Sequence, residues 1–134
     1  MPERDPSTVD ASYKRGLRLA RSGRFFEAHE AFEDAWRNCD QTERDFFQGL
    51  VHVVVSAYQA ARARPVAQER QRLKALGRLR AYAPSHRGLD VALLLEALDR
   101  AEADPREHLV ERHAQPPVAV EEEEQPERDE RGAR

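Results

Sequence analysis

Residues 24–38, RFFEAHEAFEDAWRN, repeat apolar side chains at the spacing of an amphipathic helix. When successive residues are placed about 100° apart around a helix axis, the apolar side chains form one arc. That arc consists of Phe25, Ala28, Phe32, Ala35 and Trp36. His29 and Glu33 interrupt this pattern, because both fall inside the apolar sector. The sequence therefore predicts a helix whose inner side carries one imidazole and one carboxyl group.

The following segment, from about Glu43 to Ala63, is apolar over most of its circumference. A helix of this kind is typical of the centre of a domain. Its one polar stripe consists of Gln48, His52, Ser56 and Gln59. Gly49 lies in the same sector and costs about 1 kcal/mol of helix stability relative to alanine. We therefore expect a close helix–helix approach at Gly49.

Helical patterns also flank these two segments, and no segment alternates apolar and polar residues as a strand would. Ser7–Asp10 resembles an N-terminal capping box, Gly23 a C-cap, and Asp90 an N-cap. The further helices are predicted over about 8–22, 65–82 and 91–103, with a short sixth turn or helix over about 104–113. The predicted fold is all-α, a compact bundle of five to six helices.

Length and charge indicate a single domain with an acidic tail. The 134 residues favour one helical domain over 8–114, after a flexible N-terminus at 1–7. From Glu121 onward there are seven acidic residues and three arginines, and we expect 115–134 to be disordered. The remainder carries a charge of about +1 without a concentrated basic face. We therefore expect no nucleic-acid partner.

The predicted location is the cytoplasm. Cys39 is the only cysteine, so no intramolecular disulfide can form, which favours a reducing compartment. The first ten residues carry no apolar stretch of the kind found in secretory signals. The apolar runs elsewhere are too short for a transmembrane helix. We expect no membrane partner and no cofactor.

Three stretches together resemble an uncharacterised bacterial and archaeal family, domain of unknown function number 309. They are residues 23–36, GRFFEAHEAFEDAW, residues 47–50, FQGL, and residues 84–90, PSHRGLD. The resemblance extends over about residues 10–100 and implies a compact α-helical domain from a bacterium, with no established reaction. The family usually has a glutamine in the position of His52, so any role of this histidine is specific to this chain.

Residues 16–38 are also similar to a tetratricopeptide hairpin, with a glycine, an aromatic pair, an alanine and a second aromatic residue. No second copy follows at an interval of 34 residues, whereas a repeat array needs about three units. The pattern therefore predicts a tetratricopeptide-like N-terminal hairpin and no repeat array.

The candidate catalytic residues are His29, Glu30 and Glu33. His29 and Glu33 are four residues apart and share one side of a helix. A carboxylate raises the pKa of a neighbouring imidazole while burial opposes charge, so the pair is suited to proton transfer near neutral pH. Glu27 belongs to the same cluster, and Gln48 and His52 are candidates to face it. A structural role, in which these groups bridge helices, is the alternative.

A metal site is a third interpretation of the same cluster. The string His29-Glu-Ala-Phe-Glu33 partly matches the His-Glu-x-x-His helix of zinc proteases but lacks the second histidine. A catalytic zinc needs three protein ligands, so His52 would have to supply the third. Among other residues, we expect Trp36 to be a core anchor, Cys39 to be incidental, and His86 to be solvated in a loop.

Two functions follow from these features. The first is a non-catalytic interaction or ligand-binding module, with a protein partner or a second copy of the chain as its binding partner. The alternative is a small enzyme that uses the His/Glu cluster, with metal-assisted hydrolysis as one form. The interaction module predicts a groove or exposed apolar patch beside the first two helices. The enzyme predicts an open cavity lined by His29, Glu30 and Glu33.

Overall fold

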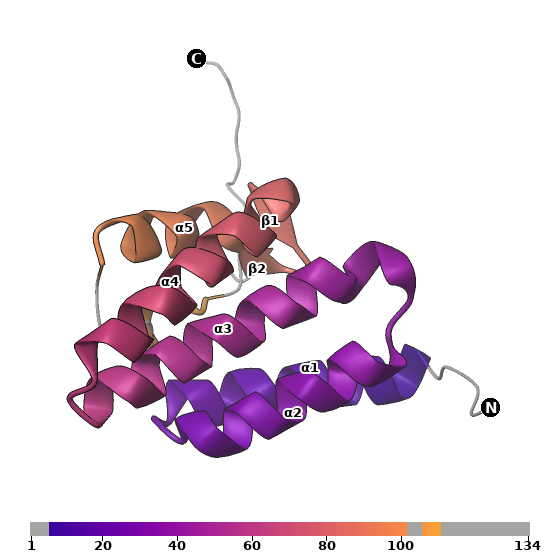
Figure 1. Cartoon of the computed structure of the whole chain (residues 1–134). Helices are drawn as coiled ribbons and strands as arrows, with labels where there is room; N and C mark the ends of the chain where they lie inside the picture. Colours follow the sequence, from indigo (N-terminus) through magenta and orange to yellow (C-terminus); the bar gives the residue numbers. More distant parts are fainter. Residues whose placement is uncertain (1–5, 102–105, 111–134) are drawn as a thin grey trace, which may run out of the picture.

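One long central helix, α3 (Arg44–Ala61), packs against helices on two sides. The computed structural model describes residues 6–101 and 106–110 (Figure 1). Helices α1 (Pro6–Arg21) and α2 (Phe25–Asn38) form an antiparallel pair below α3, and α4 (Pro65–Leu79) and α5 (Val91–Asp99) lie above it. The predicted all-α class is confirmed. The likeness of the first hairpin to a tetratricopeptide unit stays a prediction.

The central place of α3 follows from its side chains. Phe46, Phe47, Leu50 and Val54 are fully buried, and together with the inner faces of α1, α2, α4 and α5 they form one core. The centre of the Tyr13 ring in α1 lies 5.9 Å from the ring centres of both Phe46 and Phe47. Burial of aromatic rings of this size supplies a large share of the stability of a small domain.

Two glycines allow the helices of each layer to approach closely. A Cβ on Gly49 of α3 would lie 2.6 Å from Cγ of Leu79 in α4. A Cβ on Gly16 of α1 would lie 2.4 Å from Cε1 of Phe32 in α2. No non-bonded carbon pair tolerates such distances, so a side chain at either position would force the neighbouring side chain or its helix to shift. The expected close approach at Gly49 is confirmed.

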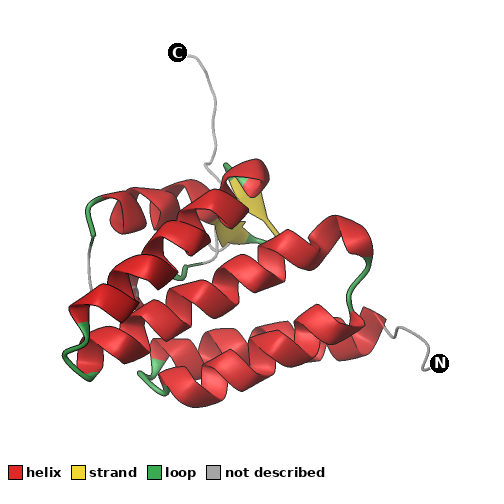
Figure 2. Ribbon diagram, in the orientation of Figure 1, coloured by secondary structure: helices red, strands yellow, loops and turns green. Residues whose placement is uncertain are grey.

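Two very short strands correct the expectation that no strand is present. β1 (Ser85–His86) and β2 (Leu89–Asp90) form an antiparallel hairpin, which Figure 2 shows beside the start of α5. Its loop is Arg87-Gly88, and both residues have a positive φ, 49° and 78°. This is the geometry that favours two-residue hairpin loops. Strands of two residues are too short to show any alternation in the sequence.

Two of the helix-capping residues predicted from the sequence are confirmed. Gly23 has φ 81° and ends α1, and the side chain of Asp90 accepts from the amide of Leu93 at the start of α5. Two expectations were wrong: Ser7 lies inside α1 instead of capping it, and α5 ends at Asp99, four residues early. Three short 3₁₀ segments connect the helices and follow α5: Gln41–Glu43, Arg80–Tyr82 and Arg106–His108.

Some expectations fall on residues that the structure does not describe. They are most of the predicted flexible N-terminus, parts of the predicted sixth segment, and the acidic tail over 115–134. Pro6 and Ser7, at the end of the predicted N-terminus, are helical. Within the described ranges, every helix is too short or too polar to cross a lipid bilayer.

Gly49→Ala should lower the free energy of unfolding by about 1–3 kcal/mol, because the added methyl group overpacks the α3–α4 contact. Gly77→Ala in α4 is the matched control, since nothing lies within 4 Å of its Cβ position. That change should raise stability by up to about 1 kcal/mol through better helix propensity. Urea unfolding of both variants measures the difference. Equal effects at the two positions would contradict the packing described for Gly49.

Candidate functional site

His29 and Glu33 meet on the surface of α2, as their spacing predicts. Nε2 of His29 lies 3.3 Å from Oε2 of Glu33. The two side chains are 26% and 37% exposed, so the pair is half-buried where the sequence predicted an inward position. Nδ1 of His29 is buried and has no hydrogen-bond partner among the described residues. The ring of Phe26 packs beside that of His29, with 5.8 Å between the ring centres, and beside that of Tyr58 in α3, with 6.0 Å between the ring centres.

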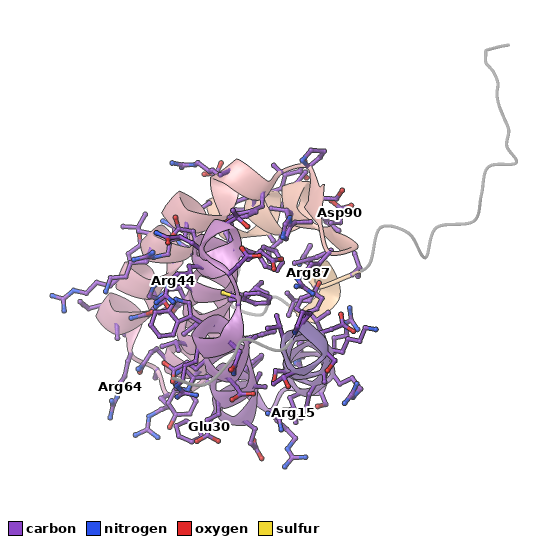
Figure 3. The ribbon with its side chains drawn as sticks, turned by 90° about the vertical axis from the view of Figure 1, so that its right-hand side faces the viewer. Arg15, Glu30, Arg44, Arg64, Arg87 and Asp90 are labelled. Atoms are coloured by element: carbon purple, nitrogen blue, oxygen red, sulfur yellow. The ribbon has the colours of Figure 1, made fainter. Side chains whose placement is uncertain are left out.

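The other two acidic residues of the predicted cluster do not join this pair. Glu30 is exposed and lies at the outer surface of α2 (Figure 3). Glu27 forms an ion pair with Arg24 at the start of the helix. The structure therefore brings His29 and Glu33 together and leaves Glu30 on the solvent side. The catalytic role of Glu30 stays a prediction, and its side chain does not join the His29–Glu33 pair.

A groove between α2 and α3 joins Glu33 to residues of the next helix. It has a volume of about 360 Å³. Its lining consists of Glu33, Trp36, Arg44, Asp45, Gln48 and Arg78. Trp36 is half-buried at the edge of the core, so the expectation of a buried anchor was only partly right. The sequence prediction that Gln48 faces the α2 cluster fits this shared groove.

His52 lies behind Gln48 and contacts α4 rather than α2. Its Nδ1 is 2.7 Å from Oε1 of Gln71, and its Nε2 is 3.5 Å from Nε2 of Gln48. Because an amide oxygen only accepts, Nδ1 of His52 carries the proton and Nε2 is left to accept from the Gln48 amide nitrogen. The hydrogen-bond network thus assigns the Gln48 orientation: its nitrogen points toward His52 and its oxygen is available to the groove.

Burial keeps His52 neutral in this role. The side chain is buried within α3, and loss of solvent lowers its pKa below the ordinary 6.5. The hydrogen bond to Gln71 raises the pKa in part, while the charges of Arg78 and Lys74 lower it further. A neutral imidazole with its proton on Nδ1 can accept the long 3.5 Å contact from the Gln48 amide nitrogen.

The charges around the groove are balanced. Arg78 pairs with Asp45 at 2.6 Å, and Arg44 lies over the Trp36 ring with its Cζ at 4.1 Å from the ring centre. Glu33 is 3.6 Å from Arg37 as well as close to His29. Groups that can accept a hydrogen bond from a bound molecule are the Glu33 carboxylate, the Gln48 amide oxygen and the Asp45 carboxylate, of which the last is already paired with Arg78. An aromatic ring with a guanidinium above it completes the site.

The metal interpretation lacks a ligand set. In the part of the chain that the structure describes, no three His, Cys, Asp or Glu side chains converge at metal-binding distances. His52, the required third ligand, is engaged by Gln71 and Gln48.

Cys39 is buried, donates to the carbonyl of Trp36 at 3.3 Å, and has its pKa raised by burial. A thiol in that state is a poor nucleophile.

A second polar cluster, around Glu43, was not among the sites predicted from the sequence. Arg87 donates to both carboxylate oxygens of Glu43, at 2.5 and 2.8 Å, and Nε2 of His86 lies 2.8 Å from the same carboxylate. The expectation of a solvated His86 was wrong, because its ring packs against Phe46 at 4.5 Å and Tyr82 at 4.8 Å. The Arg87 hydrogen bonds are the main cause that lowers the pKa of Glu43.

This cluster ties the hairpin to three other elements. Arg87 also reaches Asp10 of α1 at 3.5 Å, and its guanidinium lies over the rings of Tyr13 and Phe47. Its backbone carbonyl accepts from the Tyr13 hydroxyl at 3.2 Å. In the sequence, residues 84–90 carry the family resemblance but no pattern that indicates this cluster. The pairing with Glu43, 44 positions away, left no local signal.

Comparison with known families agrees with the resemblance seen in the sequence. The family described as domain of unknown function (DUF309) matches residues 13–70. The resemblance to this family is confirmed over that range. It contains the His29–Glu33 pair, Trp36 and Gln48. A search of curated proteins found no significant match.

His52→Gln should weaken the acid sensitivity of the fold between pH 7 and pH 5. A histidine with a lowered pKa in the folded state binds protons more readily when unfolded, so the free energy of unfolding falls as the pH drops below about 6.5. Glutamine has no such titration. Urea unfolding at pH 7 and pH 5 measures the change, and an equal loss of stability in both proteins would contradict a buried, neutral His52.

Proposed function

We propose that this protein is a non-catalytic binding module that holds a small, hydrogen-bond-donating organic cation in the α2–α3 groove. The observation that carries the proposal is the shared lining: Glu33, Trp36 and Gln48 come from two helices and open into one groove of about 360 Å³. This volume suits a small molecule rather than a folded partner. We infer that it works in the cytoplasm of a bacterium, and the single free Cys39 supports the reducing compartment.

The chemistry of the lining favours a cation over an anion. Glu33 is the carboxylate with the weakest existing pairing, at 3.3 Å from His29 and 3.6 Å from Arg37. Gln48 offers its oxygen because His52 holds its nitrogen. A primary amine or guanidinium donates to both groups, and its hydrogen bond to the Glu33 carboxylate is charge-assisted.

The Trp36 ring supplies the third contact. Arg44 already occupies the ring face as a cation, at 4.1 Å. A ligand cation that displaces this part-exposed arginine side chain makes the same kind of contact with the ring. The face of the Trp36 ring is therefore a position that suits positive charge, and Arg44 occupies it.

Enzymatic activity is the weaker alternative for the same residues. A general base needs a reacting atom within hydrogen-bond reach and a site that excludes water. His29 and Glu33 are both part-exposed, and Glu30 points away from them. Binding requires only the contacts that the groove already provides.

Association with a protein partner or a second copy of the chain stays a prediction of the sequence. One observation favours it, on a different face from the groove. Val66 and Leu73 of α4 are 64% and 54% exposed and lie seven residues apart, on one side of the helix.

Agmatine and putrescine are suitable cationic probes, and glutarate is the anionic control. Trp36 is the only tryptophan, so its fluorescence reports directly on the groove. We expect saturable quenching or a spectral shift with a cationic probe, and none with glutarate. Glu33→Gln should weaken the binding by about tenfold to a hundredfold, because a hydrogen bond to a charged group contributes about 1.5–3 kcal/mol.

Glu30→Gln is the matched control, since Glu30 is on the same helix but exposed. This variant should bind as the wild type does. Unchanged fluorescence with both cationic probes, or equal affinity in Glu33→Gln and the wild type, would overturn the proposal. A thermal unfolding curve for each variant verifies that the fold is intact.

A further inference from the structure

A second cavity, on the far side of α1 from α2, is lined by positive charge. It has a volume of about 450 Å³, and its charged lining residues are Asp10, Lys14, Arg18, Arg21 and Arg87. Lys14, Arg18 and Arg21 follow one another at helical spacing along one side of α1. We call this cavity the basic cleft. Neither the family match nor the proposed function gives it a role.

Part of the positive charge is neutralised and part is not. Lys14 pairs with Asp10 at 3.0 Å, and Arg87 is held by Glu43. Within the described residues, Arg18 and Arg21 have no carboxylate partner. Arg21 donates Nε to a backbone carbonyl, which leaves its terminal nitrogens for another acceptor. The basic cleft therefore presents two uncompensated guanidinium groups beside a lysine.

The described chain ends at this cleft. The carbonyl that accepts from Arg21 Nε, at 2.6 Å, is that of Leu109, a fully buried residue. The carbonyl of Val110, the last described residue, accepts from the amide of Asp90 at 3.0 Å. The chain that follows therefore starts from a point fixed against the C-terminal end of α1.

The chain beyond this point carries the opposite charge. Residues 121–130, EEEEQPERDE, contain seven acidic residues and one arginine. The ten residues between Val110 and Glu121 reach up to about 35 Å when extended. Lys14 and Arg21 are only about 10 Å apart along the helix axis. The acidic run can thus reach every cation of the cleft.

We propose that the acidic segment Glu121–Glu124 docks in the basic cleft of its own chain. Its carboxylates pair with Arg18, Arg21 and Lys14. Exposed ion pairs are individually weak and screened by salt. Tethering compensates for this weakness, because a short connection raises the effective concentration to the millimolar range. The docked segment covers the cleft against other polyanions and is released at high salt.

Carbodiimide cross-linking tests this contact, because it joins a carboxylate to an amine only when the two are in contact. The chain has two lysines, Lys14 in the cleft and Lys74 on α4. In the full chain at low salt, we expect peptides that link Lys14 to Glu121–Glu124, at a yield at least tenfold above links from Lys74. The links should disappear in 1 M NaCl and in the variant with Glu121–Glu124 changed to glutamine.

Arg18→Ala should lower the yield of the Lys14 links several-fold. Arg15→Ala is the matched control, since Arg15 is on the same helix but does not line the cleft. Absence of tail links while Lys14 still cross-links to Asp10 would overturn the proposal, as would equal yields at Lys14 and Lys74. A mixture of ¹⁵N-labelled and unlabelled protein distinguishes a tail that docks on its own chain from a tail that docks on a second copy. Links that are mainly mixed-isotope would replace the proposed contact with one between two copies.

Tripolyphosphate provides an independent readout of the same cleft. The glutamine variant of the tail should bind it at least tenfold more tightly than the wild type, because no carboxylates compete. Equal affinities for the two proteins would contradict coverage of the cleft by the tail.

Discussion

The ion pair between Glu43 and Arg87 connects parts of the chain that lie far apart in the sequence. Arg87 donates to both oxygens of Glu43, lies over the rings of Tyr13 and Phe47, and accepts through its carbonyl from Tyr13. The hairpin, the start of α3 and the middle of α1 therefore meet at one guanidinium. Because the Glu43 side chain is only 15% exposed, loss of either partner leaves a poorly solvated charge.

Both candidate surfaces adjoin this junction. Glu43 is followed directly by Arg44 and Asp45, which line the α2–α3 groove, while Arg87 lines the basic cleft on the other side of α3. In Figure 3, Arg44 and Arg87 lie on opposite sides of the α3 ribbon. Glu43 itself is part-buried, and its carboxylate contacts both Arg87 and His86.

Local patterns predicted the helices well, and contacts between distant residues explain what they missed. The limits of α2 agree within one residue, because its apolar arc, its charged face and Gly23 are all encoded within a few turns. The meeting of His29 with Glu33 followed from their spacing alone. The orientation of His52 could not be predicted from spacing, because its hydrogen-bond partner, Gln71, lies on a later helix. The hairpin at Arg87-Gly88 is stabilised by Glu43 and Tyr13, neither of which is near it in the sequence.

A double-mutant cycle on Glu43→Gln and Arg87→Gln tests the junction most directly. The free energies of unfolding of the wild type, both single variants and the double variant give the coupling between the two side chains at pH 7. A bidentate, part-buried pair predicts a coupling energy of about 1–3 kcal/mol. Single effects that add to within about 0.5 kcal/mol in the double variant would show that the two residues act independently. That result would contradict a junction in which Glu43 and Arg87 join the hairpin to α1 and α3.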